Sequence, residues 1–361
     1  MEYLAGIDIG GTKCSVSLGR AQEGQVELLC REKFPTPGTP REAVERMKDS
    51  LGRLLSSAPQ NRLSAVGVSC GGPLSSERGL ILSPPNLPGW DGIDILTPFE
   101  KAFGVPAFLE NDANACALAE WLWGAGKGTR NMVFLTFGTG LGAGLILDGH
   151  LYRGACDMAG EAGHIRLSQT GPVGFGKAGS FEGFCSGGGI GRMGRALAEE
   201  RGLEEKRELF STAAGIAEAA DQGDELALEI FRRTGRMLGL GLSVLVDILN
   251  PELIVIGSIF HRQEKRLRTP MEEVLKREAL PLSLASCRVV PAGLGEELGD
   301  YGALSAALNG LREKKKNRYQ EEAQKVKKDK RKDLERILRK KTGKKSAKAG
   351  KAKEAGYYEE K

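Results

Sequence analysis

The chain has 361 residues, 40% of them hydrophobic, so it is long enough for two domains with separate cores and has the composition of a soluble globular protein. No apolar run approaches the roughly 20 residues that a membrane helix needs, and the first residues lack the basic and apolar regions of a signal peptide. The seven cysteines are scattered and form no CxxC pair, which argues against a disulfide framework and favours a reduced, cytoplasmic protein.

Charge divides the chain near Gly310. Residues 311–361 contain 21 Lys or Arg and 9 Asp or Glu, a net charge of +12, whereas residues 1–310 carry a net charge of −7. The overall net charge of +5 is therefore the sum of an acidic body and a basic tail, and we expect the two parts to be physically distinct segments of the chain.

The first third of the chain is predicted to begin with a meander of three strands and to continue with alternating helices and strands. Thr39 and Pro40 suit the cap and the first position of a helix. Trp90, in the proline-rich segment SPPNLPGW, favours an ordered loop because a large apolar ring needs burial. The predicted strands span residues 3–8, 14–18, 26–31, 65–69 and 105–109, and the predicted helices span residues 39–55 and 112–123.

The second part of the body is predicted to form a glycine-rich hairpin and then mostly helices. Strand meanders followed by helices, twice over, predict two α/β lobes, over residues 1–124 and 125–310, that face each other across a cleft. The last helix is a candidate to return to the first lobe. The predicted strands span residues 131–137, 143–147, 253–256 and 288–290, and the predicted helices include residues 226–249 and 300–308.

The segment DIGGTK, residues 8–13, leads from one predicted strand straight into another. Glycines let the backbone approach an oxygen-rich ligand closely, and their N–H groups can point at phosphate. An Asp at the strand end can hold hydrated Mg²⁺, which prefers one or two carboxylates together with phosphate oxygens. The alternative is a β-hairpin turn with a polar tip, and this segment alone does not decide between them.

The segment TFGTGLGAG, residues 136–144, repeats this chemistry in the second half. A Rossmann fingerprint or a Walker A loop would lead from a strand into a helix, whereas strands are predicted on both sides of this segment. Two Gly/Thr hairpin loops, one in each lobe, could contact a polyphosphate from opposite sides. The pair is more informative than either loop alone.

The segment ENDANA, residues 110–115, stands where a predicted buried strand meets a predicted helix. A carboxylate at that junction lies beside helix N–H groups and faces the cleft outside the strand end, where α/β proteins bind ligands. Asp112 is equally suited to be an ordinary helix N-cap, which is the commoner role. The neighbouring phosphate loops favour a catalytic role for it.

Together these segments, with SPPNLPGW and EAGH, resemble the ROK family of sugar kinases and related repressors, in the family's order and spacing over about residues 3–308. The resemblance implies an α/β, two-lobed actin-like ATPase fold of the hexokinase type, which is ribonuclease H-like, with a cleft between the lobes. It also implies an ATP- and Mg²⁺-dependent hexose kinase of glycolysis, most simply a glucokinase. Kinases of N-acylhexosamines, fructose or allose are the alternatives.

The resemblance further implies roles for individual residues. Asp112 would be the catalytic base, Asp8 would lie near Mg²⁺, bound through water or phosphate, and Val255–Ser258 would flank the adenine. The residues implied to bind the sugar are Gly72, Asn86, Asn111, Asp112, Glu161, His164 and Glu182. The residues implied to bind the nucleotide are Asp8, Gly10, Gly11, Thr12, Lys13, Gly138, Thr139, Gly140, Gly142 and Gly257.

Members of this family commonly carry a zinc motif, His followed by CxCGxxGCxE, in the loop that ends at Glu182. The three cysteine positions of that motif are Val173, Phe175 and Ser180 here, and none of these side chains is a usual zinc ligand. We therefore expect no zinc. The sequence suggests that Val173, Phe175 and Phe181 form a small apolar cluster that holds the loop in place of the metal.

The tail and the choice of function leave alternatives open. Residues 321–341 can form a solvated helix, and residues 340–353 look disordered. The tail is either a solubilising appendage or a contact for nucleic acid or another anionic surface. A sugar-responsive repressor of the same family would carry an N-terminal helix-turn-helix, whereas this chain begins at the first predicted strand. We expect a sugar kinase, a homodimer and no membrane partner.

Overall fold

The computed structural model describes the backbone of residues 2–22, 24–57 and 63–355, and the side chains among them up to residue 332. The first lobe is built on a five-stranded sheet in the order β3-β2-β1-β4-β8. The pairs β1–β2 and β2–β3 are antiparallel, and the pairs β1–β4 and β4–β8 are parallel. The strands are β1 (Glu2–Ile9), β2 (Lys13–Gln22), β3 (Gln25–Pro35), β4 (Leu63–Cys70) and β8 (Ala107–Asn111).

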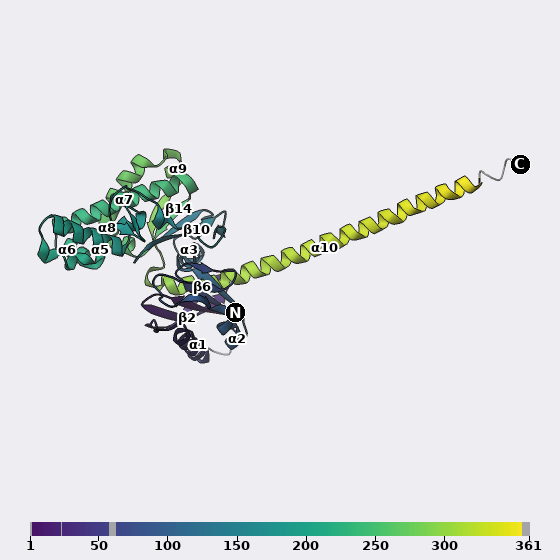
Figure 1. The fold of residues 1–361 in the computed structure, drawn as a ribbon, viewed down its shortest axis with the longest axis horizontal. Helices are drawn as coiled ribbons and strands as arrows, with labels where there is room; N and C mark the ends of the chain where they lie inside the picture. Colours follow the sequence, from purple (N-terminus) through teal and green to yellow (C-terminus); the bar gives the residue numbers. More distant parts are fainter. Residues whose placement is uncertain (1, 23, 58–62, 356–361) are drawn as a thin grey trace. The chain divides into compact units, whose positions relative to one another are not determined.

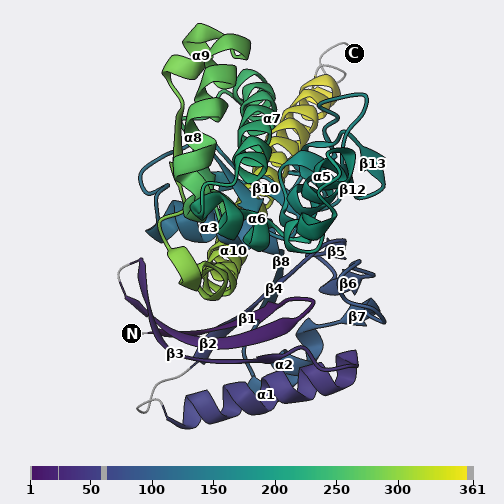
Figure 2. The same ribbon diagram turned by 90° about the vertical axis from the view of Figure 1, so that its left-hand side faces the viewer.

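Two helices cover one face of this sheet, α1 (Pro40–Ser56) and α2 (Leu96–Phe103) (Figure 2). The predicted cap of α1 is confirmed, because the Thr39 side chain accepts a hydrogen bond from the Glu42 N–H and Pro40 occupies the first turn. Trp90 is buried, so the proline-rich loop is ordered as expected. A small sheet that was not predicted lies beside this loop and consists of β5 (Leu74–Ser75), β6 (Leu80–Leu82) and β7 (Asp91–Asp94).

The second lobe repeats the arrangement with the order β11-β10-β9-β14-β15. The hairpin β9–β10 is antiparallel, and β14 runs parallel to both β9 and β15. The strands are β9 (Met132–Phe137), β10 (Leu141–Leu147), β11 (His150–Leu151), β14 (Leu253–Ile256) and β15 (Arg288–Pro291). The helices are α4 (Phe181–Phe184), α5 (Gly187–Glu200), α6 (Ala213–Asp221), α7 (Glu225–Leu249), α8 (Ile259–Glu278) and α9 (Pro281–Ala285) (Figure 1).

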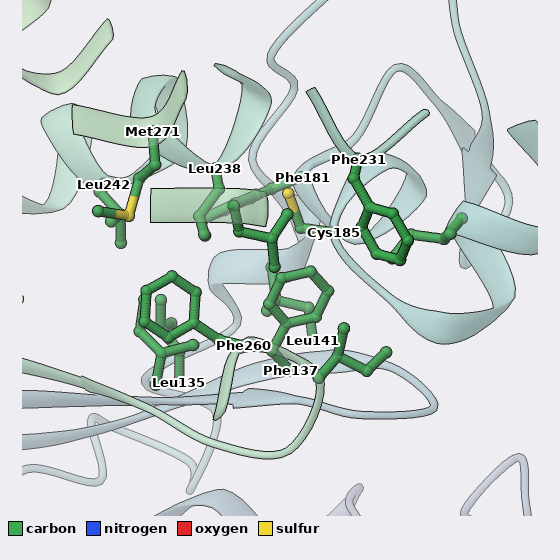
Figure 3. Close-up of a cluster of buried hydrophobic side chains, with 14 of the residues drawn as sticks. Leu135, Phe137, Leu141, Phe181, Cys185, Phe231, Leu238, Leu242, Phe260 and Met271 are labelled. Carbon is green, nitrogen blue, oxygen red and sulfur yellow. The ribbon is translucent and has the colours of Figure 1, made fainter. Parts of the chain in front are cut away.

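Alternation along β9 divides the second lobe into layers, because successive side chains of a strand point to opposite faces. Leu135 and Phe137 pack with residues of α7 and α8, as the side chains in Figure 3 show. Met132 and Phe134 pack on the other face, where they meet α3 (Asp112–Trp123). Helix α3 follows directly on the last strand of the first sheet and packs against the second, so its N-terminal end lies where the lobes meet.

The final helix, α10 (Leu298–Ala355), begins against the first sheet. Asp300 is buried in its first turn, accepts a hydrogen bond from Ser15 Oγ at 2.5 Å and pairs with Arg31 at 2.8 Å. The helix approaches so closely that a Cβ on Gly67 would clash with the Ala303 carbonyl oxygen. These contacts join the end of the body to the strands that open it.

The chain divides into two units, Met1–Gly310 and Leu311–Lys361. The backbone remains helical to Ala355, so the expectation that residues 340–353 are disordered is wrong. The segment is rich in Lys and Ala, which have high helix propensity, and it contains no proline. Within the described residues, no helix is both long and apolar enough to cross a membrane.

Candidate active site

A cavity of about 460 Å³ lies between the two lobes and brings most of the predicted site residues together. Both glycine loops, the start of α3 and the proline-rich loop contribute to its walls. The predicted residues that line it are Gly10, Gly11, Thr12, Gly72, Asn86, Asn111, Asp112, Gly138, Thr139, Gly140, Gly142, Glu161 and Glu182. Asp8, Lys13, His164 and Gly257 were also predicted and are not among its lining residues.

The first glycine loop is a tight turn between β1 and β2. The Gly10 N–H donates to the Lys13 carbonyl at 3.0 Å, and Thr36 Oγ1 donates to the Gly10 carbonyl at 2.6 Å, so the turn is held from inside and by the residue that follows β3. A Cβ on Gly11 would clash with the Asn86 backbone, which explains why glycine is required there. Asn86, on the ordered proline-rich loop, is thereby fixed against the first glycine loop at the cavity wall.

The second glycine loop connects β9 and β10. The Gly138 N–H donates to the Gly140 carbonyl at 3.1 Å, and the Gly142 N–H donates to Thr136 Oγ1 at 2.9 Å. Glu182, at the start of α4, accepts a hydrogen bond from the Leu141 N–H through Oε2 at 3.1 Å. Glu182 therefore joins the loop to the zinc-motif segment while lining the same cavity.

Asn111, and not Asp112, is the N-cap of α3. The sequence left open whether Asp112 caps this helix. Asn111 Oδ1 accepts hydrogen bonds from the Ala113 N–H at 2.9 Å and the Asn114 N–H at 3.3 Å. Asp112 occupies the first helical position, takes a hydrogen bond from the Ala113 N–H at 2.8 Å and is exposed toward the cavity. The surrounding protein displaces bulk water and raises the pKa of the Asp112 carboxyl, which favours a group that accepts a proton.

Asp8 lies at the end of β1, close beneath the first glycine loop. Burial raises the pKa of Asp8 to about 6, and the negative charge of Asp112 adds to this effect. The glycine at position 299 leaves room for the carboxylate, because a Cβ there would lie 2.9 Å from Asp8 Oδ2. Two neighbouring carboxylates beside a phosphate loop match the oxygen ligands that Mg²⁺ prefers, so these residues fit a magnesium site.

A second cavity of about 870 Å³ adjoins the first, and Gly138 and Thr139 line both. Helices α5, α6 and α8 supply the rest of its wall, including Gly187, Gly188 and Ser258. Gly257, one residue before Ser258, packs against Phe134 instead. The two cavities share the second glycine loop, so a ligand longer than either cavity can extend over Gly138 and Thr139.

The zinc-motif segment is held differently from the prediction. Val173 and Phe175 are exposed, whereas Phe181 is fully buried in the core of the second lobe, so the proposed apolar cluster of these three side chains is wrong. The segment is instead held by the pairing of β12 (Val173–Gly174) with β13 (Lys177–Ala178). Main-chain hydrogen bonds fix the hairpin, which leaves its side chains at the surface.

His164 contacts this hairpin instead of lining the cavity. Its ring meets the Phe175 ring edge-on at 5.1 Å, and its carbonyl accepts a hydrogen bond from Lys177 Nζ at 2.7 Å. Within the residues whose side chains are described, no three His, Cys, Asp or Glu side chains gather closely enough to hold a metal. Glu161 does reach the cavity, and burial raises its pKa.

Two further polar contacts at the site were missed by the sequence analysis. Glu110 pairs with Arg153 at 2.7 Å, and both oxygens of Asp157 accept hydrogen bonds from Ser76, each at 2.8 Å. Glu110 belongs to the ENDANA segment, but its partner lies 43 residues further on, and no local pattern links the two. The only available signal was a charged residue at the end of an otherwise apolar strand.

Comparisons with known proteins agree on one family. The model of the ROK family matches residues 4–309. The glucokinase of Streptomyces coelicolor is 31% identical over 318 residues, covering 85% of this chain and 98% of the relative. The xylose repressor of Bacillus subtilis is 27% identical over 311 residues, covering 85% of this chain and 77% of the relative.

A solved structure gives the same result for the fold. A ROK family glucokinase from Streptomyces griseus, in complex with glucose and AMPPNP, aligns with a TM-score of 0.69 at 30% identity, covering 85% of this chain and 99% of that one. The predicted α/β, two-lobed actin-like ATPase fold is confirmed.

Proposed function

Because the chain belongs to the ROK family and is a sugar kinase, we propose that it is a cytoplasmic glucokinase that transfers the γ-phosphoryl group of ATP to the primary hydroxyl of glucose. The observation that carries the proposal is the shared cavity, in which both glycine loops and Asp112 face one space. The glucose and AMPPNP named for the Streptomyces griseus enzyme support the same pair of ligands here. Assembly as a homodimer stays a prediction.

The two adjoining cavities suggest how the substrates are arranged. We assign the nucleoside of ATP to the larger cavity, beside Ser258, and its phosphates to the shared loop at Gly138 and Thr139. The sugar then lies in the smaller cavity among Asn86, Asn111 and Glu161. In this arrangement the terminal phosphate is directed toward the sugar cavity, as in-line phosphoryl transfer requires.

Asp112 is the proposed base. Its carboxylate accepts the proton of the sugar hydroxyl while the hydroxyl oxygen forms a bond to the γ-phosphorus, the bond from that phosphorus to the bridging oxygen breaks, and ADP leaves. The main-chain N–H groups of the glycine loops that are not used inside the turns, such as those of Gly11 and Thr139, can donate to the phosphate oxygens and offset their charge. When Mg²⁺ is bound at Asp8, it supplies further charge neutralisation to the phosphates.

The sugar specificity is tested by measuring ADP release with a panel of sugars and a sugar-free control. We expect the highest kcat/KM with glucose among glucose, N-acetylglucosamine, N-acetylmannosamine, fructose and allose. A higher value for another sugar would reject the glucokinase assignment and keep the kinase. Sugar binding without ADP release for any member of the panel would favour a regulator, the class to which the xylose repressor belongs.

The basic tail supports a second, separate activity, and we propose that it binds duplex nucleic acid without sequence preference. Residues 311–332 contain 11 Lys or Arg and 4 Asp or Glu, and every one of these basic side chains is exposed. A helix rises about 1.5 Å per residue, so 11 basic residues among 22 give one positive charge per about 3 Å of helix, close to the spacing of about 3.4 Å between phosphates along one DNA strand. The acidic body would not contribute to such binding.

We expect the full chain to bind a duplex DNA fragment with an affinity that falls linearly, on a logarithmic scale, with salt concentration. A triple variant with Gln at Lys325, Lys327 and Lys328 should lower the slope by up to about three, because each phosphate that a lysine neutralises adds roughly 0.9 to it. The matched control replaces Lys101, Lys127 and Lys276 of the body, which are also exposed. Fluorescence anisotropy measures both, and equal slopes for the two variants would reject the proposal.

A further inference from the structure

We propose that Glu110 and Arg153 are positioning residues, which hold the catalytic Asp112 in a fixed position relative to the sugar-binding Glu161. The inference rests on the proposed kinase function and adds two residues to it that are not among the lining residues of either cavity. It concerns how the base is oriented, and it depends on the contacts made by the segment from residue 152 to residue 161, here called the bridging loop.

One carboxylate oxygen of Glu110 contacts residues that lie before and after Asp112 in the chain. Its Oε1 atom accepts a hydrogen bond from the Asn111 N–H at 3.1 Å and another from Asn114 Nδ2 at 3.0 Å. Asn111 and Asn114 flank Asp112 in the chain, and Asn111 is also the helix cap. A rotation of the Glu110 carboxylate would therefore disturb the first turn of α3 on both sides of Asp112.

Arg153 fixes the other oxygen of Glu110. Both Nε and Nη2 of Arg153 donate to Glu110 Oε2, at 2.9 Å and 2.7 Å. Glu110 is 3% exposed, so its charge has almost no water to stabilise it, and the guanidinium is the charged group that compensates for it. Burial raises the pKa of Glu110, while Arg153 and the two hydrogen bonds at Oε1 act against that rise.

The bridging loop links this ion pair to the sugar site. The loop leaves the second sheet after β11, and it touches the first lobe a second time where both Asp157 oxygens bond to Ser76. Asp157, Gly160 and Glu161 line the cavity. The loop is thus attached to the first lobe at Glu110 and at Ser76, and Glu161 follows directly on these attachments.

Loss of Arg153 should act on the base more than on sugar binding. Without the guanidinium, Glu110 Oε2 loses both of its charged donors, so the buried carboxylate is no longer held in one orientation and can turn toward another partner. The hydrogen bonds to Asn111 and Asn114 then rearrange, which moves Asp112 relative to the sugar hydroxyl. A displacement of about 1 Å at a reacting group can cost on the order of 100-fold in rate.

The test measures kcat and sugar KM for Arg153→Ala, Arg153→Lys and Glu110→Gln in the full chain. We expect Arg153→Ala to lower kcat about 10- to 100-fold while KM for the sugar changes less than about threefold, because an interaction that orients the base acts in the transition state. Arg153→Lys should recover part of the loss, since it restores the charge but not the two-nitrogen contact. Arg130→Ala, which removes an exposed ion pair beside the neighbouring hairpin, is the control and should leave both constants unchanged.

A double variant that combines Arg153→Ala with Glu110→Gln distinguishes a coupled pair from two separate contributions. If the residues act as a unit, its kcat should be no lower than that of the more affected single variant. Glu110→Gln keeps the size and an acceptor oxygen, so it provides the kcat measurement if Arg153→Ala folds poorly. An inactive wild-type protein would refute the kinase proposal itself, whereas an active wild type with kcat within threefold in Glu110→Gln and Arg153→Ala would refute only the positioning pair. Equal changes in kcat and KM would also refute it.

Discussion

Replacing Asp112 with Asn is expected to lower kcat about 10²- to 10⁴-fold, the range over which a positioned general base contributes. An amide cannot accept the proton of the attacking hydroxyl, so the sugar oxygen would have to attack the phosphorus in its protonated form. The sugar dissociation constant should stay within a factor of ten, because Asn111, Asn86 and Glu161 still line the cavity. Single-turnover phosphoryl transfer gives the rate, and calorimetric titration gives the dissociation constant.

The same substitution should leave the fold intact, and the reason lies in the division of roles at the start of α3. Asn111 caps the helix, so Asp112 does not have to fulfil that function. We expect a melting temperature within a few degrees of the wild type. A large fall in melting temperature would mean that Asp112 is chiefly structural, and near-native turnover would mean that another group accepts the proton.

The parts of the site that the sequence predicted are those encoded by short segments. Each glycine loop is a few residues between two strands, and the chemistry of Gly10, Gly11, Gly138 and Gly140 can be recognised without knowledge of the fold. The ENDANA segment likewise stands at a strand end, so its place in the cleft follows from its neighbours in the chain. The cavity that these residues line together agrees with that local reasoning.

Contacts between distant residues could not be predicted in the same way. Asp300 and Ser15 are 285 positions apart, and Glu110 and Arg153 are 43 apart, so their pairing depends on how the two sheets are placed. The error over Phe175 has a similar origin. Its apolar character suggested burial, but a hairpin fixed by its main chain leaves the ring at the surface, where it meets His164.

The residues of the site therefore fall into two groups, according to the kind of contact that fixes their position. Where the backbone must pass close to another segment, as at Gly11 against Asn86, the sequence leaves a visible mark because only glycine fits. Where a side chain compensates a buried charge, as Arg153 does for Glu110, the residue is of a common type, and its neighbours in the sequence do not reveal its partner. A motif search finds the first kind of residue and misses the second.

Asp8→Asn is the substitution expected to have opposite effects on stability and on catalysis. The carboxylate has a pKa of about 6 in the folded protein against an ordinary value of 3.8, so its charge destabilises the folded state. That cost is complete above pH 6 and disappears as the pH falls toward 3.8. At pH 8, without Mg²⁺ or nucleotide, we expect the Asn variant to be more stable by about 1–3 kcal/mol, measured by urea unfolding.

The same variant should lose about 10²- to 10³-fold in kcat with Mg²⁺ and ATP, since it loses the charge that would hold the metal beside the phosphates. The stability difference should narrow from pH 8 to pH 4, because protonation removes the penalty from the wild type alone. Saturating Mg²⁺ and ATP should stabilise the wild type more than the variant, because a ligand that binds only the folded state raises its stability by mass action. If the variant is instead less stable than the wild type at pH 8 without ligands, the Asp8 carboxylate is compensated by its surroundings and does not need a metal ion. A variant that keeps its kcat would show that the metal, where it binds, is held by other groups.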